Sequence, residues 1–452
     1  MMDGVLEELV YCDQKLRART IHLCRRLFLY QHPKGNELEI MAKEEGRGVR
    51  WVQVWVAAAA MVGTLPGRTQ GLGLVTESLL KDLKIDREAY AHVNLWATLI
   101  GAFFAIGIGR LIDKAGSRIV LTVLCAALGL VTVVMSGVTG LFALTVCLTL
   151  TRGIGQGSLS VASLALPGKW FSRRLPTAMA AYSIILSMGF MIAFGIVENL
   201  VKTSGWRAPW GGIGWTLIVF LTPLCWLAVR STPESVGLPP IEAADNDPES
   251  GGDSFTLAQA LRTSSFWAIG LCSAAYGLIA SGIGLFNENI LAERGLPAGV
   301  YLNSLITTAL TSLVGNFLGG WLTSGRALRW QFKLTGISMA LLAAGLVALT
   351  KITSATEAYA LAAVMGVAGG LIIVVFFAYW GRAYGRPQLG RIQGVAQALT
   401  VLASAVGPLL LAKTASSGSY ANAFYSLAVC VALLGIWAWF TNEPTIRQQL
   451  PL

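Results

Sequence analysis

The stretch GRLIDKAGSRIVL, residues 109–121, joins two apolar segments of membrane-spanning length and determines how the rest of the chain is interpreted. Gly109 lets two helices approach closely, and Gly116 permits a sharp reversal of the chain. Asp113 can accept hydrogen bonds from the N-terminus of another helix. The stretch also holds three cations, Arg110, Lys114 and Arg118. Because cations beside a span favour the cytoplasmic side, the stretch is predicted to be a short cytoplasmic turn between two spans.

Composition places most of the chain in a membrane. Of its 452 residues, 54% are hydrophobic and 13% are charged, and the mean hydropathy is +0.62. Soluble proteins carry about 25% charged residues. The net charge of +10 comes from cations in short loops and in the N-terminal segment. Anionic lipid headgroups attract cations at those places, so membrane lipids rather than nucleic acid are the predicted partner.

Cysteine and histidine usage predicts no metal site and no cofactor. The chain has seven cysteines, none of them in a C-x-x-C pair, and three histidines. Most of the cysteines lie inside apolar runs, which is typical of small core residues.

Twelve segments approach the length of about 20 apolar residues that a helix needs to cross the hydrocarbon. They are predicted at 51–76, 89–111, 119–139, 141–166, 176–198, 208–229, 265–287, 301–323, 332–350, 358–380, 391–413 and 421–440. The predicted domains are an N-terminal segment 1–50, a six-helix bundle 51–230, a linker 231–264, a second six-helix bundle 265–441 and a tail 442–452. The linker is rich in proline and acidic residues.

The distribution of Lys and Arg predicts the orientation. Loops after even-numbered spans hold 12 of these cations and loops after odd-numbered spans hold 8. Both termini are therefore predicted to be cytoplasmic, with the chain in the inner membrane. Residues 1–50 are polar and basic without an apolar stretch, so no cleavable signal peptide is predicted. They form either a basic amphipathic helix on the cytoplasmic surface or a disordered tail, which is untranslated if Met41 is the true start.

An internal repeat relates the two predicted bundles. GLGLVTESLLKD at 71–82 aligns with GIGLFNENILAE at 282–293, and the same spacing of 211 residues places Gly320 opposite Gly109. Glycines in the fourth and tenth spans repeat at a spacing of 213: Gly153 with Gly366, and Gly157 with Gly370. Two halves related by duplication, with the substrate site between them at mid-membrane, explain this pattern. The alternative is convergent use of glycine in helix packing.

The two copies of the turn differ in charge. Around Gly320, Thr323 and Ser324 stand where an aspartate would be needed, so any lock in the second copy is expected to be weaker than the one at Asp113. The predicted gating residues are Gly109, Asp113, Gly116, Arg118 and Pro408. The proline is included because it should kink the eleventh span.

Two arginines inside spans are the main functional signal, because a charge there is costly. Arg68 follows a Leu-Pro-Gly break about 26 Å along the first span, and Arg152 lies about 16 Å into the fourth. No Asp or Glu occurs in the middle of a predicted span, so an anionic substrate is the simplest counter-charge. The alternatives are that Arg68 is solvated at the outer mouth and that Arg152 donates to backbone carbonyls.

Further polar side chains complete the predicted substrate site: Gln70, Gln156, Tyr276, Asn287, Gln393 and Gln397. For each of them, a hydrogen bond between neighbouring helices is the competing role.

The pattern Gly-x-x-x-Asp-Lys-x-Gly-x-Arg at 109–118, placed after the second of about twelve spans, resembles the loop between helices 2 and 3 of the major facilitator superfamily. Segments 152–174, 230–238 and 384–408 look like bacterial members of its monocarboxylate porter and oxalate/formate antiporter group. The resemblance covers roughly residues 50–441 and implies an all-α fold of twelve helices in two pseudo-symmetric six-helix bundles. Members of the group often carry a cation in span eight or eleven, and here Lys413 lies only at the outer end of span eleven.

The predicted function is secondary active transport of a small organic anion, a mono- or dicarboxylate, by alternating access. The protein is expected to act as a monomer, with a co-transported proton or an exchanged anion. An exporter of neutral or cationic amphiphiles is the nearest alternative and would need a membrane-buried acid. A transporter-like sensor without turnover is an alternative of another class. An enzyme is not predicted, because the sequence shows no nucleophile, metal or phosphate-loop constellation.

Overall fold

The computed structural model describes residues 35–172, 174–238, 255–415 and 420–444. Every regular element among these residues is a helix. The described residues from Val52 onward form one compact unit, to which the packing described here belongs. The predicted N-terminal segment 1–50, the linker 231–264 and the tail 442–452 lie wholly or partly outside the described residues, so the domain boundaries remain predictions.

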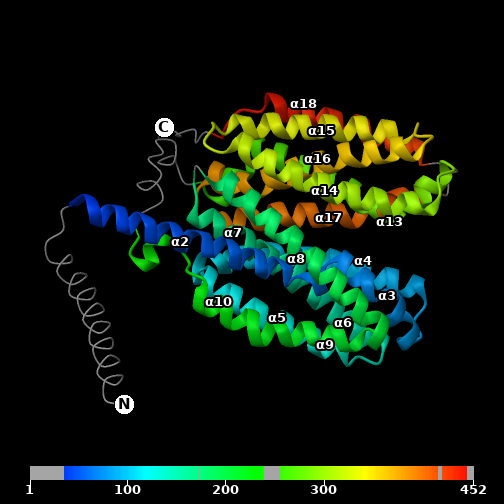
Figure 1. The fold of residues 1–452 in the computed structure, drawn as a ribbon, viewed down its shortest axis with the longest axis horizontal. Helices are drawn as coiled ribbons and strands as arrows, with labels where there is room; N and C mark the ends of the chain where they lie inside the picture. Colours follow the sequence, from blue (N-terminus) through cyan, green and yellow to red (C-terminus); the bar gives the residue numbers. More distant parts are fainter. Residues whose placement is uncertain (1–34, 173, 239–254, 416–419, 445–452) are drawn as a thin grey trace, which may run out of the picture. The chain divides into compact units, whose positions relative to one another are not determined.

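The helices follow the order of the predicted spans. The N-terminal half contains α2 (Gly35–Val62), η1 (Leu65–Gly67), α3 (Thr69–Leu83), α4 (Arg87–Ala115), α5 (Ser117–Ser136), α6 (Leu141–Thr151), η2 (Arg152–Leu159), α7 (Ser160–Trp170), α8 (Leu175–Ser204), α9 (Arg207–Thr216), η3 (Leu217–Leu221) and α10 (Thr222–Ala228). Two short helices follow, η4 (Pro233–Val236) and α12 (Leu257–Leu261). The C-terminal half contains α13 (Ser264–Glu293), α14 (Ala298–Thr323), α15 (Arg329–Leu349), α16 (Ala355–Tyr384), α17 (Leu389–Ala415) and α18 (Ala421–Phe440). Figure 1 shows α13 to α18 together on one side and α4 to α10 on the other.

Ten helical stretches among the described residues are long and apolar enough to cross a membrane. The first and fourth predicted spans do not belong to this set. In the first, η1 separates α2 from α3, because Pro66 has no N–H to donate and Arg68 has an extended backbone with φ −97° and ψ 149°. The fourth runs through η2, a π-helix that holds the polar side chains of Arg152 and Gln156. Both predicted substrate-binding arginines therefore lie where regular α-helix is interrupted.

Equivalent helices of the two halves pack through the glycines of the repeat. A Cβ atom at Gly157 of η2 would lie 2.7 Å from the Gly101 carbonyl of α4. In the second half, a Cβ at Gly366 of α16 would lie 2.5 Å from the Thr308 carbonyl of α14. The fourth span thus packs on the second, and the tenth on the eighth, where only glycine permits the approach. This agreement confirms the predicted pair of pseudo-symmetric bundles.

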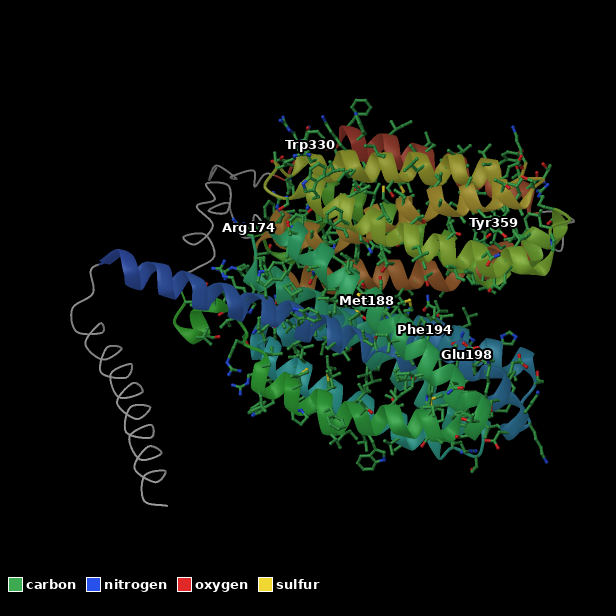
Figure 2. All side chains as sticks on the ribbon, viewed as in Figure 1. Arg174, Met188, Phe194, Glu198, Trp330 and Tyr359 are labelled. Carbon is green, nitrogen blue, oxygen red and sulfur yellow. The ribbon has the colours of Figure 1, made fainter. Side chains whose placement is uncertain are left out.

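Two seams join the halves, α4 along α17 and α8 along α14. Figure 2 shows the course of α8 by its labelled residues, from Arg174 at one end to Glu198 toward the other. The α4–α5 turn, the N-terminus of α8 and the N-terminus of α17 share one end of the unit, which we call the turn end.

Candidate functional site

Arg152 is buried in a shell of neutral acceptors. Its side chain is 1% exposed at the start of η2. Nη1 donates to the Gly67 carbonyl (3.3 Å), to Thr69 Oγ1 (3.0 Å) and to Gln156 Oε1 (2.8 Å), and Nη2 donates to Asn94 Oδ1 (2.5 Å). Nε has no hydrogen-bond partner. These oxygens replace water around the guanidinium, but they bring no negative charge.

Arg68 lies next to this shell and is only half-buried. Its Nε donates to Thr64 Oγ1 (2.7 Å), and its Nη2 donates to Ser160 Oγ (3.1 Å) and approaches Met61 Sδ (2.8 Å). Its Cζ lies 5.5 Å from the centroid of the Phe190 ring, a cation–π contact. Nη1 makes no hydrogen bond to the described residues, so its N–H groups can donate to a ligand.

Neither guanidinium forms an ion pair with a carboxylate among the described residues. The two groups are neighbours, since Arg152 donates to the carbonyl of Gly67, the residue before Arg68. Their contacts differ. Arg152 donates to a backbone carbonyl, as its alternative role requires, whereas Arg68 keeps an unbonded Nη1.

The other predicted substrate-binding residues lie in different places. Gln156 accepts from Arg152, and Gln70 is exposed beside Thr69 on α3. In α17, Gln393 is 3% exposed with its Oε1 unpartnered, while Gln397 is half-buried. Tyr276 lines an apolar cavity inside the C-terminal half. The side chain of Asn287 lies outside the part of the chain whose side chains are described.

Asp113 fastens α4 to α17 at the turn end. Its Oδ1 accepts from the backbone N–H of Gly390 (3.0 Å) and its Oδ2 from that of Arg391 (3.1 Å). Lys169 Nζ lies 4.0 Å from Oδ1, and Arg391 Nε lies 3.8 Å from Oδ2. The carboxylate is 5% exposed, so it meets the positive end of the α17 dipole away from water. The expectation that Asp113 accepts from a helix N-terminus is confirmed.

Two glycines of the turn act as predicted. A Cβ atom at Gly109 would clash with the Gly390 carbonyl, so this glycine is what allows α4 and α17 to touch. Gly116 ends α4 and begins α5 with φ +81° and ψ 157°, in the region that glycine reaches without strain.

Arg118, one of the predicted gating residues, contacts Trp226 of α10 and not Asp113. Its Nε donates to the Trp226 carbonyl at 2.7 Å, and its Cζ lies 4.4 Å from the centroid of the Trp226 ring. Arg118 therefore fastens α5 to the end of α10 inside the N-terminal half. It has no ion pair with Asp113, because Lys169 and Arg391 are the cations that approach this carboxylate.

Pro408 lies inside α17, which continues to Ala415. Its neighbour Gly407 packs against the Leu278 carbonyl of α13, so this part of α17 contacts its own half. A gating role for Pro408 stays a prediction.

The described residues of α14 include no Asp or Glu, as Thr323 and Ser324 led us to expect. A Cβ at Gly320 of α14 would clash with Ala180 of α8, which repeats the approach of Gly109 to α17. Thr177 Oγ1 donates to Ser324 Oγ at 2.6 Å. One neutral hydrogen bond thus stands where the first seam has a carboxylate between two backbone donors. This geometry is consistent with the prediction that the second seam is held more weakly than the seam at Asp113.

An ion pair adds a further link at the turn end. Arg386, in the turn between α16 and α17, donates from Nη1 to Glu234 Oε1 of η4 at 3.0 Å. Burial raises the pKa of Glu234, but hydrogen bonds from its own backbone N–H and from Arg386 lower the pKa by more than burial raises it. The pKa therefore lies below its ordinary value. The carboxylate therefore stays ionised and paired at neutral pH.

Sequence reasoning missed two residues of these sites. Asn94 accepts a hydrogen bond from Arg152. The sequence feature that could have identified it is a single amide side chain in the otherwise apolar second span. Lys169 was counted as a loop cation, yet it is 6% exposed and donates to the Ile112 carbonyl at 3.2 Å. The apolar residues of α7 around it were the available signal.

The family model of the Major Facilitator Superfamily matches residues 56–359, more than half of the chain. The chain belongs to the major facilitator superfamily. Members of this superfamily are transporters, so the protein is a multi-pass membrane transporter and its identification as a non-enzyme holds at the level of the family. No curated protein matches the chain in sequence.

Solved structures of other transporters share the fold. The human organic anion transporter MFSD10 (TETRAN) superimposes with a TM-score of 0.62 at 15% identity, covering 88% of this chain and 99% of its own. The Escherichia coli fucose:proton symporter FucP gives a TM-score of 0.62 at 16% identity, covering 86% and 98%. FucP in its outward conformation gives 0.61 at 16% identity, with the same coverage. At these identities the likeness establishes the fold alone.

Proposed function

We propose that this member of the superfamily is a secondary active transporter that moves a small organic anion, a mono- or dicarboxylate, by alternating access. The pair of neighbouring arginines is the observation that carries the proposal. Both side chains lie within the helical bundle, and no described carboxylate pairs with either of them. An anion that enters between the halves supplies the missing charge.

In this proposal the two arginines have different roles. Arg68 contacts the anion through its unbonded Nη1, and Thr64, Ser160 and the Phe190 ring hold the guanidinium in place. Arg152 stays within its shell of neutral acceptors and adds positive potential behind Arg68. A hydrogen bond between charged groups contributes about 1.5–3 kcal/mol, so loss of Arg68 should weaken binding by roughly 10- to 150-fold.

The contacts across both seams join the two halves at the turn end, so we infer that this conformation is closed there. The positive-inside rule assigns this end to the cytoplasm, with both termini on the same side, in the inner membrane. The structure then corresponds to the outward-facing state, which Asp113 stabilises. Rocking of the halves releases the anion inward, either with a proton or in exchange for another anion. Membership in the monocarboxylate porter and oxalate/formate antiporter group is part of the same proposal.

Thermal stabilisation and transport test this function. Purified protein is heated with a panel of mono- and dicarboxylates and with the corresponding neutral amides, and uptake of the best carboxylate is measured in proteoliposomes. Carboxylates should stabilise the protein and amides should not. Arg68→Gln should lose at least 10-fold in apparent affinity, Arg68→Lys should lose less, and Lys202→Gln, at a side chain 70% exposed, should match wild type. Equal stabilisation by amides, or uptake by Arg68→Gln equal to wild type, would refute the proposal.

A further inference from the structure

The repeat places an apolar cavity of the C-terminal half at the position equivalent to the arginine site of the N-terminal half. At the repeat spacings of 211 and 213 residues, both arginines and two acceptors of Arg152 have apolar counterparts. The counterparts are Ile279 for Arg68, Met365 for Arg152, Ala280 for Thr69 and Leu305 for Asn94. All four of these counterparts line one cavity. The locus that holds charge in one half is therefore apolar and open in the other.

The cavity is large enough for a small hydrocarbon group. Its volume is about 160 Å³, between α13, α14, α15 and α16. An engineered apolar cavity of about 150 Å³ holds benzene. Most of the lining is aliphatic, and the Ser304 hydroxyl is buried there without a hydrogen-bond partner. Thr308 satisfies its own hydroxyl by donating to the Ser304 and Ala362 carbonyls.

The rim of the cavity matches the rim of the arginine site. Thr69, which accepts from Arg152, is an exposed residue at the start of α3. Its counterpart Ala280 on α13 is exposed as well and belongs to the cavity lining. Because the halves are pseudo-symmetric, the two rims occupy equivalent positions in their bundles.

We propose that this cavity binds the hydrocarbon part of the transported anion while the carboxylate binds at Arg68. The transported molecule is then an amphipathic carboxylate with a tail of roughly six carbons or fewer. This assignment rests on the proposed function for its charged end. The apolar end has independent support from the cavity and its register in the repeat. Each methylene that enters such a cavity should tighten binding about fourfold.

A chain-length series tests the tail site on the purified full-length protein. Apparent Kd values for straight-chain monocarboxylates from acetate upward are measured by thermal shift, beside primary alcohols of the same length. Two variants reduce the space: Ala362→Leu inside the cavity, and Ala280→Leu at the exposed rim, which the fold can accommodate more easily. Ala360→Leu is the matched control, since Ala360 is exposed on the same helix as Ala362 and lies outside the lining.

In wild type and Ala360→Leu, affinity should rise about fourfold per methylene and level off near six carbons. In Ala362→Leu or Ala280→Leu the rise should disappear while acetate binds as in wild type. Carboxylates that bind equally at every length would overturn the tail site and leave the proposed function standing. If alcohols bind as tightly as carboxylates and lose binding in the variants, the tail site is supported, but the proposal that the substrate is an anion is refuted. A length dependence that survives both variants would also overturn the tail site.

Discussion

Replacing Asp113 by asparagine should open the turn end. The carboxylate accepts two backbone hydrogen bonds from the first turn of α17 and lies beside the buried ammonium group of Lys169. The asparagine oxygen can keep one of the two bonds, but it carries no charge. The variant therefore changes the strength of the lock while it preserves the size of the side chain.

The loss can be estimated from these contacts. One hydrogen bond to a charged acceptor contributes about 1.5–3 kcal/mol, and the favourable end of the α17 dipole adds about 0.3–1 kcal/mol. Together these amount to about 2–4 kcal/mol, all of it specific to the closed conformation. The ratio of closed to open protein should fall by roughly 30- to 700-fold, since about 1.4 kcal/mol corresponds to a factor of ten.

Disulfide formation across the second seam reports this ratio. Cysteines replace Thr177 and Ser324, whose hydroxyl oxygens are 2.6 Å apart in the closed conformation. Their background has serine at the exposed Cys430 and at Cys12 and Cys24. Copper phenanthroline should cross-link the pair readily in wild type.

Measured under conditions in which about half of the wild-type protein is closed, the same cross-linking should be at least tenfold slower in Asp113→Asn. The control Glu198→Gln removes an exposed carboxylate near the opposite end of α8 and should cross-link at the wild-type rate (Figure 2). A rate in Asp113→Asn within twofold of wild type, in protein of normal helical content, would refute the assignment of Asp113 as the lock.

Three further perturbations test other contacts. Gly109→Ala should slow the same cross-linking at least tenfold, because its Cβ clashes with α17, whereas Gly107→Ala has no atom within 4 Å of its Cβ and should behave as wild type. The ion pair of Glu234 should hold its strength above pH 4.5 and weaken as the pH falls below that ordinary value, because the pKa of this carboxyl is lowered in the folded state, so the difference in Tm between wild type and Glu234→Gln should shrink only in acid. Arg207→Ala removes hydrogen bonds to one carboxylate and two carbonyls, so its Tm in detergent should fall clearly further than that of Lys202→Ala, which loses one exposed i,i+4 pair.

Local backbone chemistry made the turn predictable from sequence. Gly109 leaves room for a neighbouring helix, and Gly116 adopts a positive φ. Both properties can be inferred from a short stretch of sequence. The partner of Arg118 could not be inferred in the same way. Its guanidinium reaches the Trp226 carbonyl, 108 residues away, and only the folded bundle brings these groups together.

The depth of the two arginines in the membrane stays a prediction from the rise per residue. Their direction around the helix axis could not be predicted from sequence, since each lies at an irregular element. The extended backbone at Arg68 resets the helix after η1, and the π-helical turn at Arg152 shifts every later side chain around the axis. This is why the sequence treated the two arginines alike, while the structure buries Arg152 to 1% exposure and leaves Arg68 half-buried with an unbonded Nη1.

The unequal seams imply that the closed turn end depends mainly on the α4–α17 seam. The α4–α17 seam combines a glycine contact with a buried carboxylate, while the α8–α14 seam has a glycine contact and the single bond from Thr177 to Ser324. A neutral hydrogen bond contributes about 0.5–1.5 kcal/mol, less than one bond to the charged carboxylate. The α4–α17 seam should therefore contribute most of the free-energy difference between the closed and open conformations, and the α8–α14 seam should separate when Asp113 is released, because each half moves as one body. Replacing Ser324 by aspartate would place a second carboxylate at the weaker seam, and it should trap the closed conformation only if a backbone donor of α8 turns toward it.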